Sequence, residues 1–175
     1  MNRIQLLPLG EVALTLLDAL QKGLAKEFSV PCEILPPERD PSYAWNVRRQ
    51  QYSSTEILAA LAARQIPSDT RLLAVTPFDL FIPILTFVFG EAQLDGRCAV
   101  VSAFRLRQEF YGLPSDHELL VSRLVKESAH ELGHTLGIAH CDDYACVMAP
   151  SHAVEWIDLK RTTLCESCRG FVRAR

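Results

Sequence analysis

The sequence predicts a mixed α/β (α+β) domain in which packed helices cover a twisted sheet. Strand-like runs rich in Val, Leu, Ile and Ala alternate with segments whose apolar residues repeat at helical intervals. Alternation of this kind favours a mixed sheet with helices on it. Hydrophobic residues make up 49% of the 175 residues, which is enough for a packed core. We therefore expect a single domain over residues 1–175.

The expected elements of the N-terminal half follow from this spacing. Residues 4–9 are predicted to form the first strand and residues 28–35 the second. Between them, the segment 11–27 carries a helical stripe made of Val12, Leu16, Leu20 and Leu24. Prolines at 36, 37 and 41 predict a long loop without regular structure up to residue 53. Further strands are expected over 71–76 and 98–104.

Two Ser-x-x-Glu capping boxes mark the starts of the remaining helices. The box at 53–56 opens a helix that continues to about residue 63. The box at 115–118 opens the longest helix, which should end near Gly137. Pro83 and Gly90 argue against a central strand between these helices, so residues 86–94 are placed at the edge of the sheet.

Charge and composition exclude several classes of function. Lys and Arg number 18 against 21 Asp and Glu, and a net charge of -3 provides no basic surface for nucleic acid. The apolar N-terminal stretch is interrupted by Pro8, Glu11 and Asp18, so neither a signal peptide nor a membrane span is expected. We expect a cytoplasmic monomer with no membrane and no nucleic-acid partner.

A metal-binding motif stands at the end of the longest predicted helix. His130 and His134 are four residues apart, so their imidazoles share one helical face and can reach one ion. Gly137 can adopt the left-handed conformation that ends a helix, and the reversed chain can then return His140 as a third ligand. Three protein ligands predict a catalytic zinc with a position left for water.

Glu131 directly follows the first of these ligands, where it can act as the general base. Zinc lowers the pKa of its water to about 7, and a carboxylate beside it can accept the proton as water attacks a carbonyl. The same proton can then pass to the leaving amine. The alternative, histidines on a solvated helix, does not account for the additional glycine and third histidine.

Four cysteines gather in the C-terminal part, residues 138–175, which follows the sheet and helices of residues 1–137. They are Cys141, Cys146, Cys165 and Cys168. Four thiolates suit a closed tetrahedral zinc, which predicts a structural site that joins the tail to the segment after His140. Disulfides or a redox pair at 165–168 are the alternatives. Cys32 and Cys98 are expected to be inert core thiols.

The whole pattern resembles a known family. The extended His-Glu-x-x-His-x-x-Gly-x-x-His motif followed by Met148 resembles the metzincin clan. A cysteine directly after the third histidine, together with Cys146 and the pair at 165–168, is similar to the archaemetzincins. The match is dense over residues 127–168. The segment Phe87-Val88-Phe89-Gly90-Glu91-Ala92 also resembles that family.

The resemblance implies a compact metzincin-like domain with two zinc ions per chain, one catalytic and one structural. It implies that Met148 and Gly137 support the first site, and that an antiparallel edge strand aligns a peptide substrate. The candidate substrate-binding residues are Phe87, Val88, Phe89 and Gly90. Tyr144 is expected to be a packing residue, and the sequence assigns no role to Arg48 or Arg49.

The expected function is peptide-bond hydrolysis by a zinc-dependent metallopeptidase. One alternative is a zinc-containing peptide-binding or regulatory module with little or no turnover. Another is a purely structural protein whose first zinc is closed by a fourth protein ligand.

Overall fold

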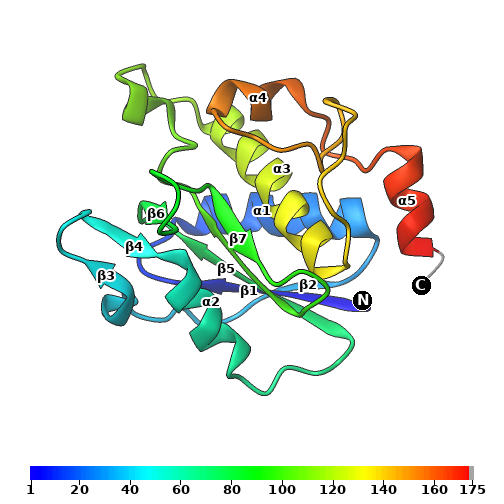
Figure 1. Cartoon of the computed structure of the whole chain (residues 1–175), viewed down its shortest axis with the longest axis horizontal. Helices are drawn as coiled ribbons and strands as arrows, with labels where there is room; N and C mark the ends of the chain where they lie inside the picture. Colours follow the sequence, from blue (N-terminus) through cyan, green and yellow to red (C-terminus); the bar gives the residue numbers. More distant parts are fainter. Residues whose placement is uncertain (174–175) are drawn as a thin grey trace.

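A five-stranded sheet forms the centre of the protein (Figure 1). The structure is a computed structural model, and it describes residues 1–173. The strands follow in the spatial order β2 (Cys32–Ile34), β1 (Arg3–Pro8), β5 (Thr70–Thr76), β8 (Cys98–Ser102) and β7 (Gly90–Ala92). The first four run parallel, and β7 pairs antiparallel with β8 at one edge. The predicted mixed sheet with an antiparallel edge strand is confirmed.

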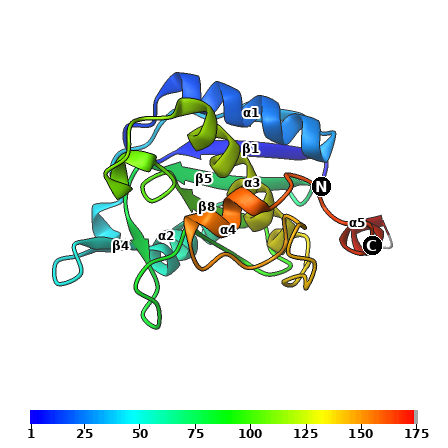
Figure 2. The ribbon, with the colours of Figure 1, turned by 90° about the horizontal axis from the view of Figure 1, so that it is seen from above.

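Helices cover both faces of this sheet because its central strands are apolar on both sides. Alternate residues such as Leu73 and Val75 pack with α1 (Leu14–Phe28) and α3 (His117–Thr135). Their neighbours Leu72 and Ala74 pack on the other face with α2 (Ser54–Ala62). Figure 2 shows α1 lying along β1. Two buried layers therefore hold the sheet in place.

The segment 36–53 departs from its prediction, because it contains regular structure. A single turn, η1 (Ser42–Ala44), leads into β3 (Trp45–Asn46) and β4 (Gln51–Ser53). With β6 (Leu80–Phe81), these strands form a second, three-stranded sheet in the order β3-β4-β6. The prolines restrict only the chain up to Pro41. Beyond it, the Asn46 side chain accepts hydrogen bonds from the backbone N–H groups of Arg48 and Arg49 and builds the turn.

Other predicted boundaries shift by a few residues. The first helix continues to Phe28 and is ended by Ser29 in the left-handed region, which shortens β2 to three residues. The predicted edge segment 86–94 pairs with β8 over only Gly90–Ala92. The N-cap of α2 is Ser53, as predicted, and its hydroxyl accepts from the Glu56 backbone N–H. The N-cap of α3 is Asp116 rather than the predicted Ser115, since the Asp116 carboxylate accepts from the N–H of Leu119.

The C-terminal part returns across the end of α3 and carries two helices that the sequence did not predict. They are α4 (Val154–Leu159) and α5 (Glu166–Arg173), and α5 stands apart from the sheet in both views (Figures 1 and 2). A further short turn, η2 (Gln108–Tyr111), precedes α3. Positions 174 and 175 of the predicted domain lie outside the described residues. Within residues 1–173, no helix combines the length and apolar character needed to cross a bilayer.

Candidate active site and metal centres

The first two histidines of the motif meet at the C-terminal end of α3. Nε2 of His130 lies 3.0 Å from Nε2 of His134, one helical turn further on. On the other side of each ring, Nδ1 is 2.8 Å from a backbone carbonyl, that of Val147 for His130 and that of Ile138 for His134. A carbonyl only accepts, so each Nδ1 carries the ring proton and donates it.

This arrangement leaves two unprotonated Nε2 atoms facing each other. Two lone pairs at that distance repel unless a cation lies between them. Nitrogen ligands about 2.0 to 2.1 Å from a tetrahedral zinc would be separated by roughly 3.3 Å, close to the spacing found here. The hydrogen-bonded second nitrogen is also the usual way in which a protein orients a metal-binding imidazole. The donor set therefore fits a zinc ion.

His140 reaches the same point because the chain reverses at Gly137. Gly137 has φ +83°, and its N–H bonds the carbonyl of His134 while the next N–H bonds that of Gly133. These two bonds make a Schellman turn, which requires the left-handed residue that the sequence predicted. The ring of His140 lies 5.3 Å from that of His130 and 5.0 Å from that of His134, centroid to centroid. One ligand atom from each of the three rings lies within 4.8 Å of the others.

Electrostatics keep these imidazoles in the form that binds metal. Burial lowers the pKa of His130 well below its ordinary value, and the positive charge of Lys160 acts in the same direction. Burial also lowers the pKa of His134 and of His140. The rings are therefore neutral at neutral pH, and metal binding has no proton to displace from them.

Glu131 lies in the wall of the same cavity. Its side chain is 5% exposed, and burial, followed by the nearby carboxylates Glu127 and Glu91, raises its pKa well above the ordinary value. A carboxyl group of this kind is a stronger base than an exposed one. Proximity to a dication would favour its ionised form again.

A cleft of about 390 Å³ connects these groups. The active-site end of α3 forms its floor, and residues 150–152 form one rim. The opposite rim is the segment 85–92, which includes the edge strand β7. All four candidate substrate-binding residues line the cleft. Phe89, however, is only 5% exposed and belongs mainly to the hydrophobic core. Gly90 brings backbone directly against Glu131.

Met148 packs against the turn of α3 that carries the first two histidines. It is fully buried, and a Cβ built on Gly133 would collide with its Sδ atom. Gly133 lies between the two helical ligands in the sequence, so the absence of a side chain there lets the methionine approach the helix. The backbone carbonyl of Met148 also accepts from the N–H of Cys141, which links the two predicted metal sites.

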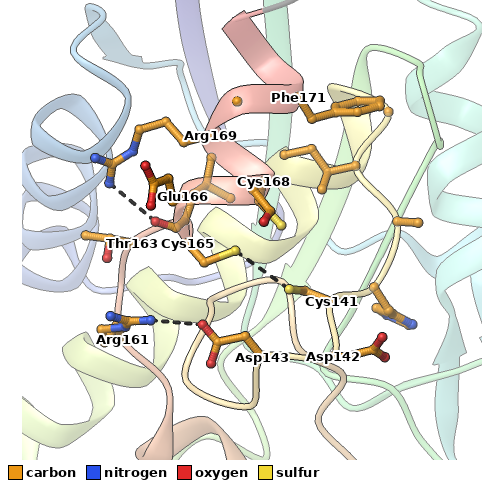
Figure 3. A pocket seen from close by; sticks show the side chains of 17 residues that line it. Cys141, Asp142, Asp143, Arg161, Thr163, Cys165, Glu166, Cys168, Arg169 and Phe171 are labelled. Carbon is orange, nitrogen blue, oxygen red and sulfur yellow. Dashed lines mark hydrogen bonds and ion pairs between the residues drawn. The ribbon is translucent and has the colours of Figure 1, made fainter.

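The four C-terminal thiols form a second cluster. Figure 3 shows three of them, Cys141, Cys165 and Cys168. Sγ of Cys141 is 3.8 Å from Sγ of Cys165, and Sγ of Cys146 is 3.9 Å from Sγ of Cys168. A disulfide requires about 2.05 Å, whereas thiolates about 2.3 Å from a tetrahedral zinc lie roughly 3.8 Å apart. The spacing excludes the disulfide alternative in this structure and fits a metal.

Backbone groups favour a thiolate in this cluster. The N–H of Cys168 hydrogen-bonds the Cys165 thiol and lowers its pKa to about 7. The N–H groups of Met148 and Cys165 also point at Sγ of Cys146. Cys141 and Cys165 turn toward one another in Figure 3, one from the loop after His140 and the other from the residue directly before α5.

Sequence reasoning missed several residues of this site. Glu127 lies one turn before Glu131 on the same face of α3, and the spacing of four could have identified it. Lys160 and Ser151 contact Glu127, but no sequence signal marked them. Arg49 donates to the carbonyls of Leu85 and Thr86 and so holds the rim.

Arg48 and Tyr144 are exposed. The side chain of Arg48 has no hydrogen-bond or ion-pair partner among residues 1–173. Tyr144, expected to pack, is instead 78% exposed. Among the described residues, the histidine group has three members and no fourth ligand.

Comparisons with known proteins match the chain to one peptidase family. Residues 24–173 match the model of peptidase family M54. The archaemetzincin of Methanocaldococcus jannaschii is 42% identical over 166 residues, which cover 95% of this chain and 90% of that protein. The archaemetzincin of Haloarcula marismortui is 35% identical over 169 residues, covering 95% and 96%.

Two solved structures are similar over nearly their whole length. One is archaemetzincin from Archaeoglobus fulgidus complexed with malonate, with a TM-score of 0.84, 36% identity and coverage of 97% of this chain and 99% of that chain. The other is a zinc-dependent peptidase from Methanocorpusculum labreanum, with a TM-score of 0.88, 31% identity and coverage of 97% and 99%.

Fold, donor set and comparisons together define the class as zinc metallopeptidase. The peptide-binding module without turnover is not favoured. Within that class, the chain belongs to the archaemetzincins, peptidase family M54.

Proposed function

We propose that His130, His134 and His140 hold the catalytic zinc of this metallopeptidase and that Glu131 is its general base. The observation that carries the proposal is the convergence of three imidazoles in a cleft whose wall contains a buried carboxyl group. Zinc bound there would polarise the scissile carbonyl and make a water acidic enough to react at neutral pH. Met148 and Gly137 support the ligands through packing and the chain reversal.

Glu131 then performs the proton transfers of the reaction. Its carboxylate accepts a proton from the attacking water and passes it to the leaving amine nitrogen. The buried setting favours the protonated form, so the proton is held until the amine takes it.

The edge strand gives the substrate its orientation. β7 is hydrogen-bonded to β8 on one side, and no strand of the described residues pairs with its other side. An extended peptide can add there as a further strand, with its scissile bond above the histidines. Strand addition needs an extended chain, so we infer that the substrates are short or unfolded peptides.

A second zinc is proposed at Cys141, Cys146, Cys165 and Cys168, which gives two ions per chain. Four thiolates leave no position for water, so this ion is structural. Four thiols that fit a metal ion rather than two disulfides support a cytoplasmic location. We also propose that residues 1–175 form one domain that acts as a monomer. The net charge of -3 supports a chain without nucleic-acid partners.

The test compares zinc-loaded wild-type protein with Glu131→Gln on a library of unstructured peptides. The variant should keep the zinc content of the wild type and lose cleavage by about 100-fold or more, because the proton acceptor is missing. Equal cleavage rates in the two proteins would contradict the assignment of Glu131. No cleavage by either, with both zinc sites filled, would contradict this site as the peptidase centre.

A further inference from the structure

A lysine without any role in the proposed reaction is buried behind the first zinc ligand. The side chain of Lys160, directly after α4, is 1% exposed. Its Nζ atom lies 3.5 Å from Oε1 of Glu127, whose side chain is 4% exposed. The same Nζ lies 3.4 Å from the carbonyl oxygen of Val147. The ammonium group is thus surrounded by protein.

The carbonyl of Val147 connects this lysine to the metal site. It accepts from Nδ1 of His130 at 2.8 Å and from Nζ of Lys160 at 3.4 Å, one donor for each lone pair. The orientation of the His130 ring therefore depends on where this carbonyl is held. Lys160 is the group that ties the carbonyl to Glu127 on α3, the helix that carries His130 itself.

Stability alone does not explain a buried ion pair at this place. Taking an ammonium and a carboxylate out of water is costly for each ion, and their mutual attraction often fails to offset that cost. A positive charge so close to a cation site also opposes metal binding. Glu127 cancels that charge, and Ser151 donates a further hydrogen bond to the same carboxylate oxygen at 3.5 Å.

We propose that Lys160 and Glu127 are positioning residues for the first zinc ligand. The ammonium fixes the Val147 carbonyl, the carbonyl fixes the His130 ring, and the carboxylate neutralises the ammonium so that the dication is not repelled. This inference rests on the proposed histidine zinc site. It adds to that site an ion pair without net charge, whose function is to maintain the affinity of the histidines for the metal.

The chain contains a matched control in Lys126. Lys126 is also buried, at 8% exposed, and also joins α3 to the end of α4. Its Nζ donates to the carbonyls of Ile157 and Asp158, at 3.0 Å and 3.1 Å. Neither carbonyl contacts a histidine. Lys126 therefore connects the two helices as Lys160 does, but it has no contact that could position a zinc ligand.

The experiment measures Co²⁺ affinity at the histidine site in the full chain. Co²⁺ is titrated against a chelator, and thiolate charge-transfer absorption distinguishes the cysteine site from the histidine site. Lys160→Met should weaken Co²⁺ binding to the histidines by about 10-fold to 100-fold, as removal of partners behind a metal ligand does. Lys126→Met should destabilise the fold with less than about a twofold change in that affinity.

The proposal is overturned if Lys160→Met binds Co²⁺ within about twofold of wild type, or if Lys126→Met loses as much affinity. Should Lys160→Met not fold, Glu127→Gln replaces it, because the amide oxygen can still accept from Lys160 while the negative charge is gone. Affinity should then fall by about tenfold, and unchanged affinity contradicts the proposal. Metal affinity is measured without peptide, so the result does not depend on whether Glu131 is the general base.

Discussion

Gly90 of the edge strand touches the carboxyl group of Glu131 on the active-site helix. A Cβ built on Gly90 would lie 2.7 Å from both Cγ and Oε1 of Glu131, and 2.7 Å from the carbonyl oxygen of Val100. Side-chain carbon atoms essentially never come this close. The strand that is proposed to align the substrate and the residue proposed to move the proton are therefore in contact only because position 90 has no side chain.

Gly90→Ala should accordingly impair catalysis more than folding. Backbone blocks the new methyl group on one side, so the edge strand or the Glu131 side chain must move. Displacements of this size cost on the order of 10-fold to 100-fold in kcat/KM, whereas zinc content should stay the same. Steady-state kinetics measures the change in kcat/KM, and metal analysis measures the zinc content. Gly170→Ala is the control, since a Cβ there meets nothing within 4 Å. Wild-type activity in Gly90→Ala would contradict the contact.

Arg49 should determine how well the rim of the cleft holds a peptide. Its guanidinium donates to the carbonyls of Leu85 at 2.6 Å and Thr86 at 3.0 Å, and lies 4.3 Å from the ring centroid of Phe81. Arg49→Met removes these bonds and loosens the rim. KM should rise by roughly threefold to tenfold with little change in kcat, because such bonds contribute about 1 kcal/mol each.

Arg48→Met provides the comparison, because the neighbouring side chain makes none of these contacts. It should leave KM unchanged. A fall in kcat without a rise in KM for Arg49→Met would show that the rim acts on the chemistry rather than on binding.

Cys165→Ser should remove the structural zinc and loosen the C-terminal part. A serine hydroxyl is a poor zinc ligand, and metal sites of this kind contribute about 10 kcal/mol or more of apparent binding energy. We expect one zinc fewer per chain and a lower melting temperature, seen by metal analysis and calorimetry. Cys32→Ser, outside the cluster, should keep its zinc. Unchanged zinc content in Cys165→Ser would rule out the four-cysteine assignment.

The stability of the zinc-free protein should depend on pH through Glu127. Burial raises the pKa of Glu127 above its ordinary value, more than the charge of Lys160 lowers it. Between the unfolded pKa of about 4.3 and the raised native pKa, the native state binds more protons than the unfolded state. The free energy of unfolding therefore falls as pH rises through that interval.

The Glu127→Gln variant has no carboxyl proton at this position. Its free energy of unfolding should therefore not show this decrease with rising pH. Chemical denaturation at a series of pH values, with the variant subtracted from the wild type, isolates the contribution of Glu127. The opposite slope, with wild type gaining stability as pH rises, would mean that Lys160 outweighs burial and lowers the pKa.

Local patterns predicted much of this fold because their causes are local. The apolar stripe of the first helix and the Ser53 cap involve residues within a few positions of each other. The structure confirms the cap and, in the stripe, Leu16, Leu20 and Leu24, whereas Val12 precedes the helix, which begins at Leu14. The N-cap was predicted wrongly where two neighbouring residues could both cap the same helix. Ser115 and Asp116 can both cap a helix, and the actual start of α3 places Asp116 in that role.

The sequence by itself determined the grouping of the three histidines, because helical spacing and the Gly137 turn dictate that their side chains converge. It also indicated the four-cysteine group, because these cysteines gather in the C-terminal part, and the family, because the motifs are dense over residues 127–168. Only the tertiary structure determined which residues, distant in the sequence, pack around the site and its cleft. Lys160 meets Glu127 across 33 positions, and Arg49 meets Leu85 across 36. Such contacts depend on how the return of the C-terminal part and the second small sheet pack against the central layers. The local periodicity of the sequence carries no information about that packing.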